Sequence, residues 1–213
     1  MLINPSEASY SATITKKRGG TLHKLFHTTL MSFSHVEPAH HWVGPCVGSP
    51  MAVMTLEKLI ALGIQKLIVF GWCGSLTPEL EIGNLLIPEF GLSDEGVSRH
   101  YPIQEAPLTS NALQTDLHKL FPTAQQGKIW TTDAPFREFP KDIAIHRTNG
   151  LKAVDMEFTA LCTVCNFYGI EMAGLMVVSD ELFHDSWKSG INTKQFKKKA
   201  KKTLNLLMEN LPK

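Results

Sequence analysis

The sequence lacks both a long apolar run and an excess of charge of one sign. Its 213 residues include 21 lysines and arginines and 20 aspartates and glutamates, giving a formal net charge of +1. No stretch approaches the ~20 apolar residues of a membrane span, and the start of the chain does not read as a secretory signal. Balanced charge gives no indication of a nucleic-acid or membrane partner. We therefore expect a cytoplasmic protein with neither kind of partner.

Cysteine is scarce, and metal-binding patterns are missing. Four cysteines in a chain of this length give no disulfide framework. Cys162 and Cys165 form a C-x-x-C inside an expected helix, whereas a reactive thiolate is favoured at a helix N-terminus, so we expect ordinary packing there. No second C-x-x-C or spaced histidine pair completes a zinc site. The sequence predicts no metal site and no cofactor.

What the sequence does contain is an alternation of apolar runs and helical patterns. With 43% apolar residues, the chain can bury one large core. Strands alternating with helices predict an α/β fold with a mixed or mostly parallel sheet flanked by helices. The segments before 41 and between 132 and 157 show no clear pattern. The expected strands are 41–43, 66–70, 84–88, 128–131 and 172–178, and the expected helices are 51–62, 110–120, 158–168 and 193–211.

Two carboxylates stand at the ends of these expected elements. Glu157 comes directly before the helix at 158–168, and Asp180 follows the strand at 172–178. An acid at the carboxyl end of a buried strand lies where open α/β sheets bind ligands. From this local pattern alone, a helix cap or a solvated loop explains such an acid equally well.

The glycines that follow the strand at 66–70 favour a ligand-binding role for these acids over a helix cap or a solvated loop. Glycine lets a ligand approach the backbone closely. Together, the segments 59–88 and 154–182 resemble the purine nucleoside and uridine phosphorylase family, which includes methylthioadenosine and adenosylhomocysteine nucleosidases. The resemblance runs from about Gly44 to the C-terminus. It implies a single domain over 1–213, with a divergent N-terminal segment at 1–40, folded as a three-layer sandwich around a mixed sheet.

The resemblance also implies roles for the paired acids. Breaking a bond between ribose and base requires a proton for the leaving base and anchors for a sugar that becomes positively charged. In the family, the residues that match Glu157 and Met156 bind the ribose hydroxyls and pack under the sugar. The residue that matches Asp180, preceded by Ser179, donates a proton to N7 of a purine. An acid that works near neutral pH needs a raised pKa, which burial or a nearby anion provides.

Six further positions match family loops near the substrate. Phe136 stands one residue later than the aromatic that stacks on the base, and a core phenylalanine beside a turn is the alternative interpretation. Arg137 contacts either a ligand or a surface acid. The remaining positions belong to a glycine turn at 71–74 and to a loop near the site and the subunit interface: Cys73, Gly74, Arg99 and His100.

The family's phosphate-binding elements are altered. A phosphate dianion is held by arginine forks, backbone N–H groups and hydroxyls. The family's G-D-P-x-R loop appears here as Ile3-Asn4-Pro5-Ser6-Glu7, and its R-x-G-[ST] element as Val69-Phe70-Gly71-Trp72. Both arginines are missing, although Arg18, Arg99, Arg137 or a neighbouring subunit would restore positive charge.

Three functions therefore remain open. The resemblance favours an enzyme that cleaves a purine-type nucleoside with phosphate as co-substrate, by a narrow margin. The missing arginines favour a nucleosidase that uses water, for which Glu7 is the nearest residue to an activating base. A nucleoside-binding protein without turnover is the third. Family sites borrow residues across subunits, so we expect a homo-oligomer, a dimer or a hexamer.

Overall fold

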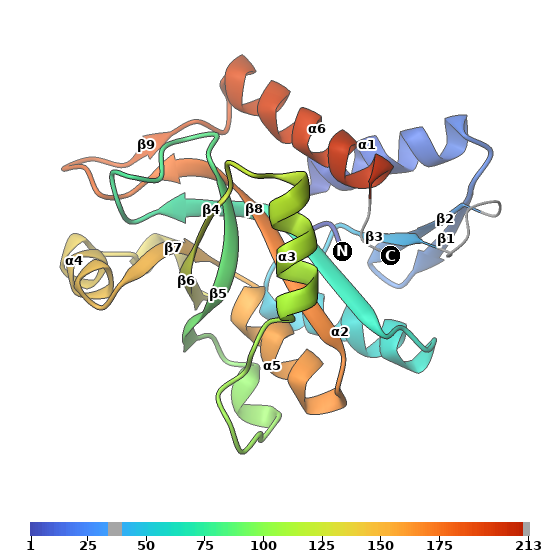
Figure 1. Cartoon of the computed structure of the whole chain (residues 1–213), viewed down its shortest axis with the longest axis horizontal. Helices are drawn as coiled ribbons and strands as arrows, with labels where there is room; N and C mark the ends of the chain where they lie inside the picture. The colour runs from blue at the N-terminus through green and yellow to red at the C-terminus, as the bar shows by residue number, and fades with distance from the viewer. Residues whose placement is uncertain (34–39, 211–213) are drawn as a thin grey trace.

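The computed structural model describes residues 1–33 and 40–210 (Figure 1). At its centre is a six-stranded mixed sheet with the order β4-β7-β6-β5-β8-β9. Because β4 also pairs with β8, the first five strands of that order close into a ring. A separate antiparallel sheet contains β1, β2 and β3. The strands are β1 (Thr21–Leu25), β2 (Thr28–Ser32), β3 (His41–Gly44), β4 (Lys66–Ser75), β5 (Leu85–Asp94), β6 (Gln125–Thr132), β7 (Leu151–Asp155), β8 (Glu171–Glu181) and β9 (Lys188–Ser189).

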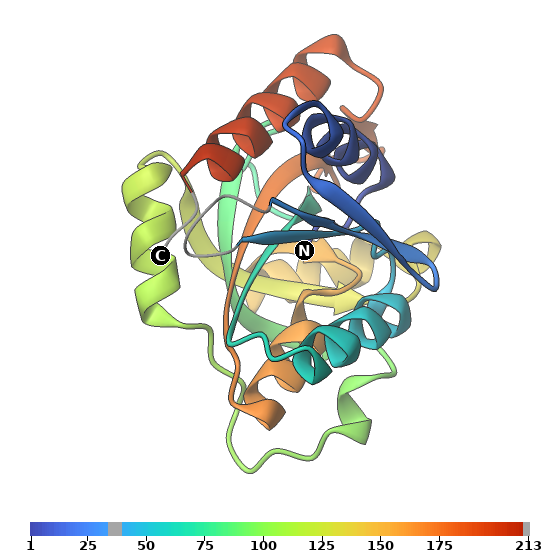
Figure 2. The same ribbon diagram turned by 90° about the vertical axis from the view of Figure 1, so that its right-hand side faces the viewer.

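Helices cover the central sheet on several sides. Helices α1 and α6 lie side by side at one end of the molecule, and α2 and α5 lie together at the other (Figures 1 and 2). The predicted mixed sheet flanked by helices is confirmed. No helix in the described ranges is both long and apolar enough to cross a membrane. The α-helices are α1 (Pro5–Lys17), α2 (Ser49–Ala61), α3 (Asn111–Leu120), α4 (Pro140–Thr148), α5 (Phe158–Tyr168) and α6 (Lys194–Glu209), and the 3-10 turns are η1 (Ser98–His100) and η2 (Pro135–Arg137).

The first residues of the chain are tied to the edge of β4. The Leu2 amide donates to Val43 O (2.7 Å), and the Ile3 amide donates to Phe70 O (3.0 Å). The N-terminal amine donates to Ile68 O (2.6 Å), and its burial lowers its pKa to about 6. This pairing fixes where α1 begins, and the chain then continues into β1.

Four regions differ from the sequence prediction. The glycines at 71–74 do not form a turn after β4 but belong to it, since β4 stays paired with β8 through Ser75. The segment expected to be irregular contains α4 and β7. The N-terminal segment contains α1, whose serines and threonines are weak helix formers, so its stability comes from packing. The expected helix at 193–211 ends at Glu209, and 211 lies outside the described residues.

Close packing between β8 and α5 depends on a glycine. A Cβ atom at Gly174 would lie 2.6 Å from Cε2 of Phe158 and 3.0 Å from Cγ of Pro88. The Phe158 side chain is fully buried, so it has no free space into which it can move. Residue 174 therefore sets how closely α5 approaches the sheet.

We predict that Gly174→Ala lowers the free energy of unfolding by about 1–3 kcal/mol, the usual cost of overpacking a core. Urea unfolding followed by circular dichroism measures it. Gly96→Ala is the matched control, because its added Cβ would meet only Asp133 Oδ2 at 3.5 Å. The control should stay within about 0.5 kcal/mol of the parent protein. Equal effects of the two substitutions would contradict this account.

Candidate active site

The carboxyl ends of β4, β7 and β8 meet at Gly74. In the strand register, Gly74 pairs with Val154 of β7 on one side and with Asp180 of β8 on the other. The β4–β8 register shifts between Cys73 and Gly74, leaving Ser179 as an extra residue in β8. Such bulges redirect side chains and are frequent beside active sites. Here the bulge brings Asp180 next to the β7–α5 junction.

Only glycine fits at this meeting point. A Cβ atom on residue 74 would press on Leu182 and lie 3.2 Å from both Asp180 Oδ2 and Val154 Cγ1. The Ser179 Oγ lies 3.2 Å from Cys73 O of the opposite strand, beside the bulge. The absence of a side chain at residue 74 is thus what lets the acid of β8 approach the end of β7.

A cavity of about 630 Å³ opens at this junction. Its walls come from distant segments: the residues before α1, the strand ends, the η2–α4 connection and the loop at 182–187. The cavity is lined by Ile3, Asn4, Val47, Trp72, Cys73, Gly74, Pro135, Phe136, Glu138, Pro140, Ile143, Val154, Asp155, Met156, Glu157, Ser179, Asp180, Leu182, His184, Asp185, Trp187 and Ile191.

Asp155 holds the β7–α5 junction in place. Its Oδ1 accepts a hydrogen bond from Thr131 Oγ1 (2.6 Å), and its Oδ2 accepts from the amides of Phe158 (2.8 Å) and Glu157 (3.2 Å). These amides open α5 and have no partner within the helix, so the carboxylate acts as its cap. Asp155 therefore fixes the backbone that carries Glu157.

Glu157 is buried and points at the loop before α2. Its Oε1 accepts a hydrogen bond from the Gly48 amide (2.5 Å), and its side chain shows little exposure to solvent. Burial and the nearby charge of Asp155 raise the pKa of Glu157. Burial also raises the pKa of Asp155. The two acids are thus held close together in a site that disfavours a second negative charge.

Asp180 is held by a hydrogen-bond donor at each carboxylate oxygen. The Ser179 hydroxyl donates to Oδ1 (2.5 Å), and the indole Nε1 of Trp187 donates to Oδ2 (2.8 Å). Trp187 comes from the loop that returns toward β9, so the placement of this acid depends on how that loop is anchored.

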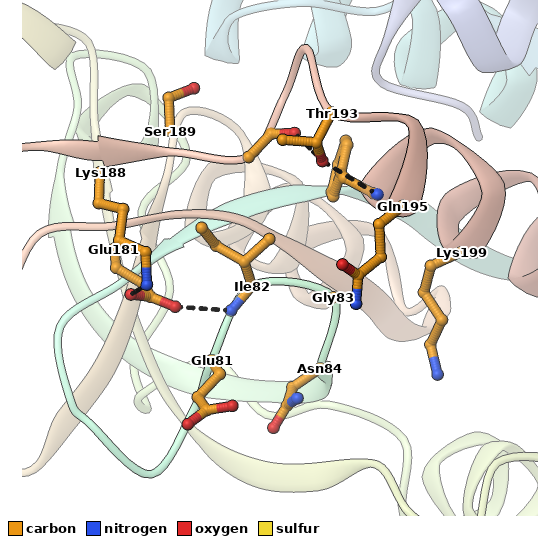
Figure 3. A pocket seen from close by; sticks show the side chains of 12 residues that line it. Glu81, Ile82, Gly83, Asn84, Glu181, Lys188, Ser189, Thr193, Gln195 and Lys199 are labelled. Atoms are coloured by element: carbon orange, nitrogen blue, oxygen red, sulfur yellow. Dashed lines mark hydrogen bonds and ion pairs between the residues drawn. The ribbon is translucent and has the colours of Figure 1, made fainter.

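Glu181 provides the anchor on the opposite face of β8. Its carboxylate accepts hydrogen bonds from the Ile82 amide (2.9 Å), Lys188 Nζ (2.8 Å) and His184 Nε2 (2.8 Å). Figure 3 shows Lys188 and the Ile82 amide converging on it. Burial alone would raise the pKa of Glu181, but the hydrogen bonds from Lys188, Ile82 and His184 outweigh burial and lower it to about 2. Glu181 directly precedes the loop at 182–187, and it binds Lys188, which directly follows that loop. The carboxylate therefore fixes both ends of the loop.

The cavity drawn in Figure 3 is a different one, of about 570 Å³. It lies between the Ile82 turn and the start of α6, and its buried acid is Glu181, which is already bonded three times. The cavity that joins Glu157 and Asp180 is therefore the better candidate for chemistry.

Charge in that larger cavity is strongly one-sided. None of its described lining residues is lysine or arginine. Cys73 stays a neutral thiol, since burial and the charges of Asp155 and Asp180 raise its pKa. In the parts of the chain that the structure describes, no three histidine, cysteine, aspartate or glutamate side chains are arranged so that they could hold a metal ion. The acids that line the cavity are Glu138, Asp155, Glu157, Asp180 and Asp185.

Comparison with known proteins places this chain in a family. The profile of the phosphorylase superfamily matches residues 13–211. The chain belongs to the phosphorylase superfamily. Over 149 residues it is 30% identical to the DeoD-type purine nucleoside phosphorylase of Caldanaerobacter subterraneus subsp. tengcongensis, covering 65% of this chain and 63% of that protein. The chain thus spans less than two thirds of that relative's length.

Solved structures of the superfamily share the fold. The purine nucleoside phosphorylase of Toxoplasma gondii, in complex with immucillin-H, superposes with a TM-score of 0.83 at 16% identity, covering 98% of this chain and 87% of that one. The AMP nucleosidase of Bacteroides thetaiotaomicron gives a TM-score of 0.71 at 23% identity, with 98% and 87% covered. The fold therefore occurs in both phosphorylases and nucleosidases.

Most residues that the sequence assigned to the site of this superfamily member do line the cavity. Phe136 stands at its edge with 97% of its surface exposed. Arg137 does not line it: its guanidinium lies over the Phe139 ring (4.5 Å) and faces a neighbouring pocket. Arg99 and His100 lie in η1, which packs on α5 away from the cavity. The residues that do line it are Cys73, Gly74, Phe136, Met156, Glu157, Ser179 and Asp180.

Several residues that line the cavity were not predicted from the sequence. Glu138 stands two positions after Phe136, directly after the segment that was compared with the family, so its carboxyl group was a visible signal. Trp187 follows Asp180 closely, but nothing in the sequence indicates that its indole returns to that acid. Asn4 lines the cavity, and its Oδ1 is buried without a partner in the described chain.

The buried acids predict how stability depends on pH. A carboxyl group whose pKa rises on folding stabilises the protein fully below its unfolded pKa, about 4.5 for Glu157, and this stabilisation is lost as pH rises through the folded value, about 8. We expect the thermal midpoint of the ligand-free protein to fall across this range and Glu157→Gln to flatten the fall. Glu105→Gln, at an exposed position, is the control and should follow the parent curve. Parallel curves for Glu157→Gln and the parent protein would contradict the assignment.

Proposed function

We propose that this chain cleaves the N-glycosidic bond of a purine-type nucleoside. One observation carries the proposal: Met156 and Glu157 from the β7–α5 junction and Asp180 from the end of β8 open into the same cavity. These are the residues that the family resemblance assigns to the ribose and to the leaving base. Phe136 at the cavity edge offers an exposed ring for stacking on the base.

The electrostatics of the cavity suit this reaction. As the bond breaks, positive charge grows on the sugar, and an acidic lining stabilises that charge more in the transition state than in the ground state. Glu157, buried and fixed by Gly48 and the α5 cap, accepts hydrogen bonds from the ribose hydroxyls. Asp180 stands at the base end, where the leaving group needs a proton.

Water is the acceptor that the cavity favours. A phosphate dianion requires cationic or N–H partners, and the described lining offers acids instead. Aligned on Pro5, Glu7 occupies the place of the arginine in the family's phosphate loop. Glu7 is buried, and burial raises its pKa. Its neighbour Asn4 presents an unpaired acceptor to the cavity.

Phosphorolysis is the second candidate, and it is the one that the sequence resemblance favoured. It is supported by the relatives named purine nucleoside phosphorylase. In that case, a homo-oligomer would supply the missing cation from a neighbouring subunit.

We predict that Glu157→Gln raises KM and lowers kcat for a purine nucleoside, with a combined loss in kcat/KM of about 100-fold or more. The physical reason is that hydrogen bonds to the ribose tighten as charge develops on the sugar. Steady-state release of free base measures the loss. Glu105→Gln, at an exposed position that does not line the cavity, is the control. Unchanged kinetics in Glu157→Gln would remove this residue from the site.

Turnover of adenosine, inosine, guanosine, methylthioadenosine and uridine, each with and without phosphate, tests the function and the acceptor. We expect release of purine and free pentose without phosphate. A strict requirement for phosphate, with pentose 1-phosphate as product, would establish the second candidate. No base release from any substrate would overturn the proposed function.

A further inference from the structure

We propose that Trp187 is a positioning residue, whose indole orients the carboxyl group of Asp180 toward the leaving base. The ion pair of Glu181 and Lys188, on the opposite face of β8, in turn holds Trp187 in place. The proposal rests on the proposed function, because it concerns the proton that the leaving base needs. It keeps Asp180 as the proton donor, as the family resemblance implies, and adds residues to which that resemblance gives no role.

The orientation of the Asp180 carboxyl group is set by two hydrogen bonds. The torsion between Cβ and Cγ of an aspartate is broad and roughly two-fold, so a single hydrogen bond leaves the group free to turn. Asp180 has a donor at each oxygen: Ser179 Oγ at Oδ1 (2.5 Å) and Trp187 Nε1 at Oδ2 (2.8 Å). A carboxylate has roughly four acceptor positions, so these two bonds leave room for a proton. Without the indole, only the adjacent serine would restrain the group.

The oxygen that Trp187 binds lies at the junction of the strands. A Cβ atom on Gly74 would lie 3.2 Å from Asp180 Oδ2, and all three residues line the cavity. Trp187 reaches this oxygen from the solvent side, with 65% of its own surface exposed. Because so little packing surrounds the indole, its place depends on the backbone that carries it.

That backbone is held by β9, which begins directly after Trp187. The strand contains only two residues, and its Lys188 lies opposite Glu181 of β8. The buried carboxylate of Glu181 accepts a hydrogen bond from Lys188 Nζ (2.8 Å), as Figure 3 shows. A second bond, from the Gly190 amide to Ser179 O (2.8 Å), lies on the far side of β9 from Trp187. The ion pair is therefore the tie next to the tryptophan.

The step that depends on this arrangement is proton transfer. The carboxyl proton of Asp180 passes to a ring nitrogen of the purine while the bond from C1′ to the base breaks and its electron pair stays with the base. The oxygen of a water molecule bonds to C1′ and loses a proton to solvent, and Asp180 regains a proton from solvent before the next turnover. A misplacement of about 1 Å can cost about 100-fold in rate, so a turned carboxyl group is enough to slow this step.

Substrates that differ in their need for a proton test the role of Trp187. The ring nitrogen of 7-methylinosine is already alkylated and positively charged, so its base leaves without protonation. Trp187→Phe keeps an aromatic ring but removes the N–H group. We expect it to lower kcat for inosine by about 10- to 100-fold, and kcat for 7-methylinosine by less than about threefold. Lys188→Met should reproduce this selective loss, although Lys188 lines the second cavity.

Two matched controls separate positioning from general damage. Trp130→Phe removes an indole that also donates to an aspartate, Asp94 Oδ2 (3.3 Å), and that does not line the active-site cavity. Lys199→Met removes another lysine of the second cavity. Both controls should leave the ratio of the two kcat values unchanged. Equal losses on both substrates in Trp187→Phe would indicate direct contact with the substrate and overturn the positioning role, as would no loss on either.

Exchange of the Trp187 indole proton with water, followed by nitrogen-15 NMR in the ligand-free protein, tests the arrangement without turnover. The signal, identified by its absence in Trp187→Phe, should be protected in the parent protein and in Lys199→Met. It should lose that protection in Asp180→Ala and in Lys188→Met. Rapid exchange in the parent protein, or protection that survives Lys188→Met, would overturn the inference. If the parent protein cleaves neither nucleoside, the proposed function and the positioning role fail, and the exchange rate still decides whether the ion pair holds the indole.

Discussion

The arrangement of this protein depends on the close approach of three strand ends at Gly74. The β4 strand pairs with β8 along its length and with β7 only at its end, so Gly74 is where both partners meet. Because this position has no side chain, Asp180 and Val154 can lie against the same backbone atom. The cavity, the bulge at Ser179 and the ring closure of the sheet all follow from this contact.

A second constraint is electrostatic. Several acids and no described lysine or arginine line the cavity. These acids differ in how many hydrogen bonds they accept and in how tightly they hold a proton. Asp155 accepts three hydrogen bonds, and Glu181 behind the sheet binds Lys188 and His184. Glu157 and Glu138 have fewer partners and hold their protons more tightly. The result is a site suited to a cationic sugar and poorly suited to an extra anion.

The loop at 182–187 links these two features. Glu181 fixes its start and, through Lys188, its end, while Trp187 reaches back to Asp180. The opposite face of β8 therefore contributes to the geometry of the cavity without lining it. Changes at Glu181 or Lys188 would act on Asp180 only through the position of this loop, which separates a positioning role from direct contact with a ligand.

Sequence by itself determined the alternation of strands and helices, the family, and the ends of α5 and β8 that carry Glu157 and Asp180. These features are local or depend on motifs, so short segments are enough to indicate them. It did not indicate α1 or β7, whose stability comes from packing and strand pairing, and it interpreted the glycines of β4 as a turn. Only the tertiary structure decided that Glu138 shares a cavity with Asp180, that Trp187 returns to it, and that Arg99, His100 and Arg137 lie elsewhere. Contacts between residues distant in sequence depend on strand register and loop anchoring, and neither leaves a periodic signal in the chain.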